Sequence, residues 1–228
     1  MSFAAAPIWV SIETSVTATI ITFFLGLAAA HRRVNSPGKR GQLMDALFVI
    51  PLVLPPTVVG YLLLLLLGRS SPLGREIQDL GFNVLFSWPA TVIAATVVAF
   101  PLMYLSTRGA LEQVSPGYVQ AARTLGASEW SIFWRITLPL AWPGVLAGTV
   151  LAFSRALGEF GATLMIAGNI PGRTQTLPIA IFFAAEAGDM SQALAWVLIT
   201  VGIASVAIFM LNNWGRRPQA FAMGGKST

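Results

Sequence analysis

Hydrophobic positions in this sequence form long continuous blocks, and polar positions gather in the segments between them. The blocks cover residues 8–30, 43–67, 86–106, 140–168 and 190–211, and the connecting segments cover residues 31–42, 69–85, 107–139 and 169–189. A helix needs about 20 apolar residues to cross a bilayer, and each block reaches that length. The pattern therefore predicts an all-α integral membrane protein with about five transmembrane helices, organised as one domain over residues 1–228.

The composition supports this class and excludes several others. Only 10% of the 228 residues are charged, whereas a soluble domain carries about 25%, and the mean hydropathy is +0.72. The sequence has no cysteine and a single histidine, His31, which excludes thiolate and polyhistidine sites, so we expect no bound metal. The net charge of +5 comes from basic residues spread over several short segments. Because they form no patch with interleaved aromatic residues, we do not expect nucleic acid as a partner.

Lysine and arginine are distributed unequally between the two sides that five membrane crossings would define. Three residues lie on one side, Arg69, Arg75 and Arg173. Ten lie on the other: Arg32, Arg33, Lys39, Arg40, Arg108, Arg123, Arg135, Arg216, Arg217 and Lys226. Because positive residues favour the cytoplasmic side, we expect the N-terminus outside and the C-terminus in the cytoplasm.

The second apolar block contains helix-breaking residues at membrane depth. Pro55 and Pro56 are followed by Thr57, and each proline removes a backbone donor from the helix. Non-helical backbone in a bilayer is tolerated only against protein or a water-filled cavity, so these three residues are candidates for lining a translocation path. A half-helix beginning near Pro56 would point its positive end at an anion. The interpretation that we favour is a proline kink that shapes packing.

Two opposite charges lie inside the fourth block. Arg155 and Glu159 are four residues apart and therefore share one helix face. Charges inside a bilayer are costly and usually face a bundle interior or a cavity. One interpretation is a polar element of a gate or pore lining. The other, which we favour, is a structural ion pair that neutralises its own charges.

The segment 107–139 is long for a loop and predicts two short helices. Ser115 and Pro116 are suited to start the first helix, and Gly126 is suited to end it. Tyr118, Ala121, Ala122 and Leu125 would form one apolar face of this helix. Ser128 is suited to start the second helix, which carries Trp130, Phe133 and Trp134 and ends at Leu138-Pro139. The small residues favour insertion of the first helix into a groove on a cytoplasmic protein, and the alternative is a helix lying on lipid.

These residues carry a family resemblance. Gln120-Ala121-Ala122-Arg123-Thr124-Leu125-Gly126, followed by Ile136-Thr137-Leu138-Pro139, resembles the Glu-Ala-Ala loop in the membrane subunits of ABC importers. The resemblance implies a type I ABC-importer fold in which this loop forms coupling helices that dock on ATPase subunits. The implied coupling residues are Gln120, Ala121, Ala122, Arg123, Leu125, Gly126, Leu138 and Pro139. Gln120 stands where the family has Glu, which keeps a hydrogen-bonding group but removes one salt bridge.

Three further stretches resemble molybdate permeases, namely 52–61, 156–163 and 168–172. The resemblance implies a permease subunit of the bacterial cytoplasmic (inner) membrane that imports molybdate, or tungstate, by alternating access. The implied partners are a second copy of this chain, two ATP-binding cassette subunits and an extracytoplasmic molybdate-binding protein. Contacts to that binding protein would come from Asn169, Pro171, Gly172 and Arg173. This chain would be no enzyme and bind no cofactor, because ATP and magnesium belong to the partner ATPase.

Other functions agree less well with the sequence. Sulfate permeases share the stretch Gly158-Glu159-Phe160-Gly161, so sulfate or thiosulfate import is the runner-up. A proton- or sodium-driven secondary anion transporter is disfavoured, because the sequence has no inverted repeat and five spans do not divide into equal halves. The ending Gly225-Lys226-Ser227-Thr228 resembles the end of a phosphate-binding loop, but position 220 is alanine where that motif needs glycine. We therefore do not expect this chain to bind nucleotide.

Overall fold

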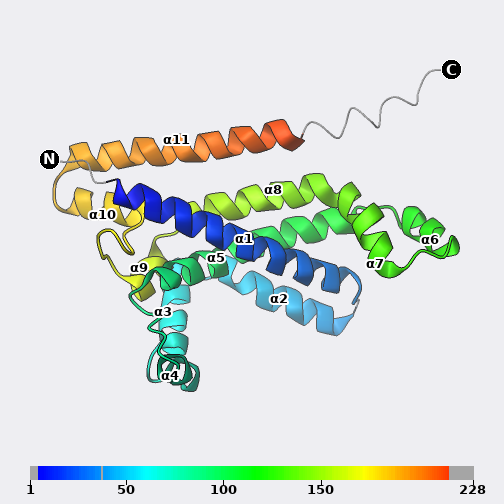
Figure 1. Ribbon diagram of the computed structural model, residues 1–228, viewed down its shortest axis with the longest axis horizontal. Helices are drawn as coiled ribbons and strands as arrows, with labels where there is room; N and C mark the ends of the chain where they lie inside the picture. The colour runs from blue at the N-terminus through cyan, green and yellow to red at the C-terminus, as the bar shows by residue number, and fades with distance from the viewer. Residues whose placement is uncertain (1–4, 37, 216–228) are drawn as a thin grey trace.

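The computed structural model describes residues 5–36 and 38–215, and every regular element in those ranges is helical (Figure 1). Within them, four helices are long and apolar enough to cross a membrane: α1 (Ala6–Val34), α5 (Trp88–Glu112), the helix over Glu129–Leu157 and α11 over Met190–Phe209. A bent pair, α2 (Lys39–Val53) with α3 (Pro56–Leu67), makes up a fifth candidate span. The remaining helices are α4 (Pro72–Asp79), α6 (Pro116–Thr124), α9 (Gly161–Ala167) and α10 (Leu177–Glu186). The predicted all-α class with about five spans is thus confirmed.

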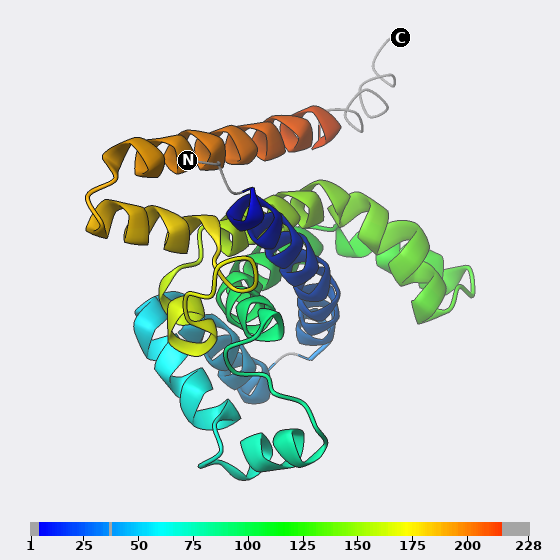
Figure 2. The ribbon, with the colours of Figure 1, turned by 60° about the vertical axis from the view of Figure 1, so that its left-hand side comes forward.

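Helices α1, α5 and α8 (Leu138–Leu157) run side by side and form the centre of the molecule (Figures 1 and 2). Small residues at their contacts allow close approach, as is usual between membrane helices. The buried alanines of this core are Ala18, Ala95, Ala99, Ala141 and Ala152. Polar contacts between helices add to the packing. The Thr14 and Thr91 hydroxyls lie 2.9 Å apart, and the Ser106 hydroxyl donates to the Gly144 carbonyl at 2.9 Å.

The second apolar block, residues 43–67, is broken by a sharp turn and not by the simple proline kink that the sequence favoured. The axes of α2 and α3 meet at 113°, and Leu54 and Pro55 between them have extended backbone with ψ of 142° and 137°. Each of these two residues precedes a proline, which disfavours the helical conformation. The sharp turn sends α3 and α4 out to the side of the central helices (Figure 1).

From Glu129 to Leu157 the chain is helical through α7 (Glu129–Ile132), the π-helical segment η1 (Phe133–Thr137) and α8. The prediction that the second coupling helix ends at Leu138-Pro139 is therefore wrong. In the π-helical turn the Leu138 amide donates to the Phe133 carbonyl, five residues earlier. A proline in an ordinary helix lacks the donor for the carbonyl four residues earlier and crowds that carbonyl. The widened turn just before Pro139 accommodates its ring, and the helix continues.

The fourth apolar block, residues 140–168, is also divided. Helix α8 ends at Leu157, and α9 begins at Gly161 after a short break. The third block extends beyond its predicted end at residue 106, because α5 continues to Glu112. The predicted C-terminal charges Arg216, Arg217 and Lys226, and the stretch 225–228, lie outside the described residues.

The two ends of the molecule differ in the elements they carry. Helices α9 and α10 lie at the end where α1 begins, and α6 and α7 lie at the opposite end (Figure 1). Helix α11 packs on α10 and α8, with Trp196 buried against Leu177 and Ala180. Its outward side chains are mostly apolar and exposed, a pattern typical of a helix that faces lipid.

Candidate functional site

The predicted coupling loop forms a two-helix projection beyond the central helices. Helix α6 ends in a turn at Gly126, whose φ is +80°, and the Ala127 amide donates to the Ala122 carbonyl at 3.1 Å. The Ser128 hydroxyl accepts from the Ser131 amide at 3.3 Å and starts α7. Gly126 and Ser128 therefore act as the predicted helix stop and start. Ser115, the expected cap of α6, precedes that helix but makes no capping hydrogen bond through its side chain.

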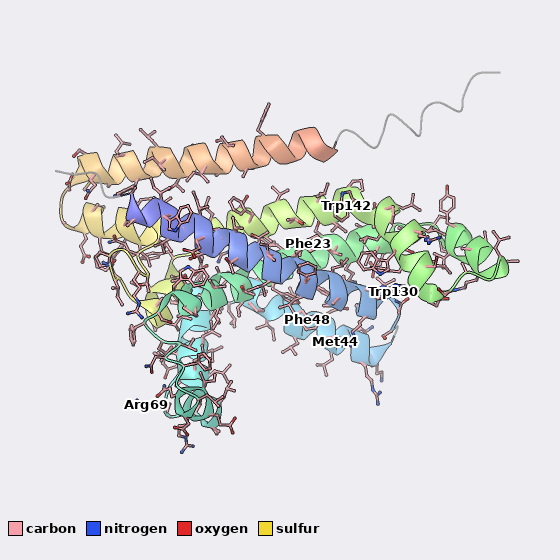
Figure 3. All side chains as sticks on the ribbon, viewed as in Figure 1. Phe23, Met44, Phe48, Arg69, Trp130 and Trp142 are labelled. Carbon is pink, nitrogen blue, oxygen red and sulfur yellow. The ribbon has the colours of Figure 1, made fainter. Side chains whose placement is uncertain are left out.

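The predicted apolar face of α6 is divided between the protein and its surroundings. Ala122 is buried against the chain itself, whereas Gln120 and Ala121 are exposed. Around the turn, Leu125 is 87% exposed and Trp130 is 72% exposed. Figure 3 labels Trp130 on the projection. Leu138 is buried at the start of α8 and Pro139 is exposed beside it. The projection thus presents two large apolar side chains outward.

Arg123 links the two helices of the projection. Its Nε and Nη2 donate to the two carboxylate oxygens of Glu129 at 2.6 and 3.0 Å. This hydrogen bonding raises the pKa of Arg123 above its ordinary value. The paired geometry fixes the angle between α6 and α7, although the pair is solvent-exposed and adds little to overall stability. Arg123 therefore shapes the projection, and its charge is already engaged by its own chain.

A pocket of about 810 Å³ separates the projection from the ends of α1 and α5. Its lining brings Gln120 and the Arg123–Glu129 pair together with His31 of α1 and Glu112 of α5. The His31 ring also lies against Phe133, with ring centroids 4.1 Å apart. The chain therefore contacts α1 at Phe133, directly after α7, while α6 and α7 face α5 across a pocket with a mixed polar and apolar lining.

The path candidates Pro55, Pro56 and Thr57 are all exposed at the bend between α2 and α3. Behind them α3 packs closely on α9, because Gly60 presents no side chain. A Cβ at position 60 would lie 2.8 Å from Ala162 Cα and 2.8 Å from Met165 Cβ. The bend is therefore anchored on one side by α9 and open on the other.

Arg155 and Glu159 form the predicted ion pair, with Arg155 Nη1 2.7 Å from Glu159 Oε2. The Ala162 amide donates to Glu159 Oε1 at 2.8 Å, so the carboxylate also caps the start of α9, which the sequence did not reveal. The Glu159 residue is only 2% exposed. Both of its oxygens are thus engaged within the chain, which connects α8 to α9.

The loop after α9 is held by its own polar side chains. The Thr174 hydroxyl accepts from the Ile170 amide at 3.0 Å, and the Gln175 amide group donates to Asn169 Oδ1 at 2.9 Å. Pro171, Gly172 and Arg173 are exposed at the turn. The loop therefore presents these three residues outward, while Asn169 is engaged in stabilising it.

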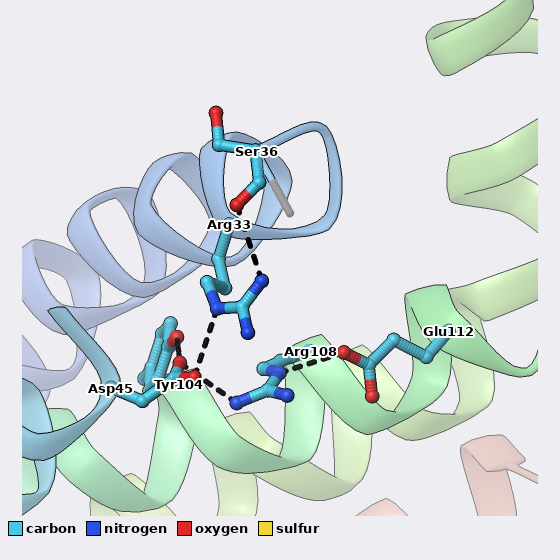
Figure 4. Close-up of polar contacts among 6 residues, drawn as sticks. All are labelled: Arg33, Ser36, Asp45, Tyr104, Arg108 and Glu112. Carbon is cyan, nitrogen blue, oxygen red and sulfur yellow. Dashed lines mark hydrogen bonds and ion pairs between the residues drawn. The ribbon is translucent and has the colours of Figure 1, made fainter. Parts of the chain in front are cut away.

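A charged cluster that sequence reasoning missed joins α1, α2 and α5 (Figure 4). Asp45 of α2 accepts from Arg33 Nε of α1 at 2.9 Å and pairs with Arg108 Nη1 of α5 at 2.7 Å. The Tyr104 hydroxyl also donates to Asp45, and Arg108 Nε pairs with Glu112 at 2.7 Å. The available signal was an aspartate inside the apolar block 43–67, since ionisable residues within predicted spans usually have a partner.

Within the described ranges, no group of three or more His, Asp or Glu residues is arranged to hold a metal ion. The charged side chains singled out above are paired: Arg123 with Glu129, Arg155 with Glu159, and Asp45 with two arginines.

Comparison with known proteins gives consistent results. A family model described as "Binding-protein-dependent transport system inner membrane component" matches residues 22–218. The molybdenum transport system permease protein ModB of Escherichia coli (strain K12) is 43% identical over 208 residues, which is 90% of each chain. A protein of Chlorokybus atmophyticus named "Probable sulfate transport system permease protein cysT" is 34% identical over 204 residues, 89% of this chain and 70% of that protein.

A solved structure supports the fold. It is an inward-facing conformation of the MetNI methionine ABC transporter, with a TM-score of 0.73 and 16% identity, covering 92% of this chain and 93% of that chain. At this identity the likeness concerns the fold alone. It agrees with the type I ABC-importer fold that the sequence resemblance implied.

Proposed function

Because the chain belongs to the family of binding-protein-dependent transport system inner membrane components, we propose that it is the membrane-spanning subunit of an ATP-driven importer of molybdate. The observation that carries the substrate class is 43% identity to a molybdenum transport permease over 90% of both chains. The apolar helices fit a membrane permease. A dianion cannot cross hydrocarbon without a very large desolvation cost, so a protein path opened in turns is required. Tungstate, an oxyanion of the same shape and charge, is included in the proposal.

The family works with ATPase subunits and a substrate-binding protein, and the projection suits the first of these partners. In our proposal Leu125 and Trp130, with the exposed Gln120 and Ala121, enter a groove on each ATPase subunit. Arg123, Gly126, Leu138 and Pro139 set the shape of the projection and its continuity with α8. ATP and magnesium stay on the partner subunit, and this chain transmits movement only.

Two copies of this chain would enclose the path, with the bend at Pro55, Pro56 and Thr57 facing it. The support is that these residues are exposed on a single chain although they follow an apolar helix. Arg155 and Glu159 lie behind the path and hold α8 to α9. On the opposite end from the projection, the turn at Pro171, Gly172 and Arg173 would receive the loaded binding protein.

The proposed location is the bacterial cytoplasmic membrane, with α6 and α7 in the cytoplasm and the N-terminus outside. The unequal distribution of lysine and arginine supports this orientation. Sulfate or thiosulfate remains the second candidate substrate because of the 34% identity to the protein named as a sulfate permease. The identity to the molybdenum permease is higher and covers more of that relative, so molybdate is preferred.

The test is reconstitution of this chain in proteoliposomes with its ATPase and binding protein, followed by uptake of labelled molybdate. We expect uptake that requires ATP and is inhibited by tungstate more strongly than by sulfate. Equal competition by sulfate would favour the second substrate. Uptake driven by a proton or sodium gradient without the ATPase would contradict the proposal altogether.

A pair of leucine variants tests the docking surface in the same system. Leu125→Asp is expected to abolish co-purification with the ATPase, because a charge would be forced into an apolar groove. Leu80→Asp is the matched control, since Leu80 is also highly exposed but directly follows α4 and is not part of the projection. Equal loss of the ATPase in both variants would show that α6 is not the docking element.

A further inference from the structure

Helix α2 is attached to the rest of the chain by very few contacts. Its one fully buried residue is Gly41, and its leucines at 43 and 47 and Val53 are exposed. Two of its side chains contact α5: Phe48 packs on Phe100 and Tyr104 at ring-centroid distances of 5.3 and 5.1 Å, and Asp45 pairs with Arg108. These two residues are three positions apart and lie on one helix face. The position of α2 is therefore set largely at this face.

Asp45 is the centre of the polar part of that contact (Figure 4). It receives donors from both neighbouring helices, Arg33 of α1 and Tyr104 and Arg108 of α5. Arg33 also packs over α2, because a Cβ at position 41 would lie 2.8 Å from its Cζ. Within the described part of the chain, Asp45 is the carboxylate that Arg33 pairs with. Loss of the Asp45 charge would leave Arg33 without an ionic partner and would remove the ion pairs that hold α2 to α1 and α5, leaving the Phe48 contact on α5.

The cluster lies between the projection and the bend of the proposed path. On one side, Arg108 holds Glu112, which ends α5 and lines the pocket shared with Gln120 and Arg123. On the other side, α2 leads from Asp45 to the turn at Pro55-Pro56. Asp45 therefore connects two elements. One is the end of α5 that lies next to the projection, and the other is α2, the helix that leads to the bend.

We propose that Asp45 is a positioning residue for transport coupling: it fastens α2 to α1 and α5, so that a displacement of the projection moves the bend at Pro55-Pro56. This inference rests on the proposed importer function and adds a residue that the coupling loop does not contain. Without Asp45, the ATPase still drives the projection, but α2 no longer follows it. Hydrolysis then continues while molybdate transport falls.

The experiment compares Asp45→Asn, which keeps the shape and removes the charge, with Asp45→Glu, which keeps the charge. Glu186→Gln, an exposed acid at the end of α10, is the control for charge removal. In reconstituted complexes we expect Asp45→Asn to raise the ATP hydrolysed per molybdate transported several-fold. Asp45→Glu should restore most of the coupling, and Glu186→Gln should match the wild type.

A second measurement follows α2 itself and does not depend on the substrate. Because the sequence has no cysteine, Val53→Cys at the exposed end of α2 accepts a single spectroscopic label. We expect the label signal to change when ATP is added to the complex, and this change to disappear with Asp45→Asn. The complex can hydrolyse ATP and show the label response without transporting molybdate. In that case the proposed substrate is wrong, and the label response with and without Asp45→Asn still tests the role of Asp45.

Two outcomes would overturn the inference. They are an unchanged ratio of ATP to molybdate in Asp45→Asn and a label response equal to that of the wild type. If Asp45→Asn does not assemble, Tyr104→Phe replaces it, because this variant removes one hydrogen bond to Asp45 and leaves every charge in place. In Tyr104→Phe, a rise in the ratio of ATP to molybdate that is smaller than the rise expected for Asp45→Asn supports the inference. An unchanged ratio in Tyr104→Phe refutes it.

Discussion

At the scale of single residues, Gly126 is a position where the backbone conformation restricts the choice of side chain. Its φ of +80° suits glycine and disfavours L-residues, while no atom lies within 4 Å of an added Cβ. The cost of a substitution is therefore backbone strain alone, about 1–2 kcal/mol for most residues and least for Asn.

We accordingly expect Gly126→Val to loosen the turn between α6 and α7 and to raise the ATP hydrolysed per molybdate, with Gly126→Asn close to the wild type. Gly117→Ala is the control, because Gly117 lies inside α6 and an added Cβ would meet only the Ser115 hydroxyl at 3.6 Å. The ratio is measured in proteoliposomes, with the amount of inserted protein determined in parallel. Indistinguishable Val and Asn variants would mean that the turn conformation does not matter for coupling.

The Arg155–Glu159 pair leads to a prediction about assembly. Arg155→Ala leaves a carboxylate that is almost completely buried without its cation, and breaking such a pair costs about 3–5 kcal/mol. The double variant Arg155→Ala/Glu159→Gln removes the leftover charge and keeps an acceptor for the Ala162 amide. We expect the double variant to be more thermostable in detergent than the single one.

Oxyanion selectivity should stay unchanged in both variants. A double variant less stable than Arg155→Ala, or a changed order of molybdate and sulfate, would instead support the gate-lining interpretation.

At the residue scale, the sequence correctly predicted features that depend on residues close together in the chain. The pairing of Arg155 with Glu159 follows from four-residue spacing, and the stop at Gly126 follows from its tolerance of positive φ. Asp45 was not identified, because its partners Arg33 and Arg108 come from other helices, 12 and 63 positions away. The division of α6 into buried Ala122 and exposed Ala121 also depends on neighbours that periodicity does not specify.

At the scale of elements, the contact between α3 and α9 depends on the missing side chain of Gly60. Gly60→Ala would put a Cβ 2.8 Å from the Ala162 backbone and from Met165 Cβ, and overpacking of this kind costs about 1–3 kcal/mol. We expect a lower thermal midpoint and reduced uptake, because α3 moves away from α9. Gly202→Ala in α11 has free space around it and should be neutral or slightly stabilising. Equal midpoints for the two variants would contradict the close packing.

Helix positions were predictable from apolar block length, but helix interruptions were only partly so. The residues that break the second block were recognised, and the size of the turn, 113°, was not. Pro55 and Pro56 remove backbone hydrogen bonds from the helix, so the chain can form either a kink or a sharp turn. Packing of α3 on α9 favours the turn. At Pro139 the reverse happened. The sequence predicted that Pro139 would end a helix. Pro139 lies inside a continuous helix instead, because a single π-helical turn precedes it.

At the scale of the whole molecule, one ring contact and several ion pairs link elements from the two ends. Phe133, directly after α7, contacts His31 of α1, the Asp45 cluster joins α1, α2 and α5, and Glu159 joins α8 to α9. The sequence predicted the number of spans because that depends on composition. It did not predict these links, because they depend on which helices become neighbours.

The orientation of the molecule in the membrane is the prediction that all partner assignments share. The sequence predicts ten basic residues on the side of the projection and three on the other, and this imbalance favours a cytoplasmic projection. Leu125→Cys and Arg173→Cys place single thiols at the projection and at the outer loop, both exposed, in a chain with no other cysteine. In intact cells whose outer surface is accessible, a membrane-impermeant thiol reagent should label Arg173→Cys and leave Leu125→Cys unlabelled until the membrane is opened. The opposite pattern would move the projection away from cytoplasmic ATP, and no ATPase could then dock on it.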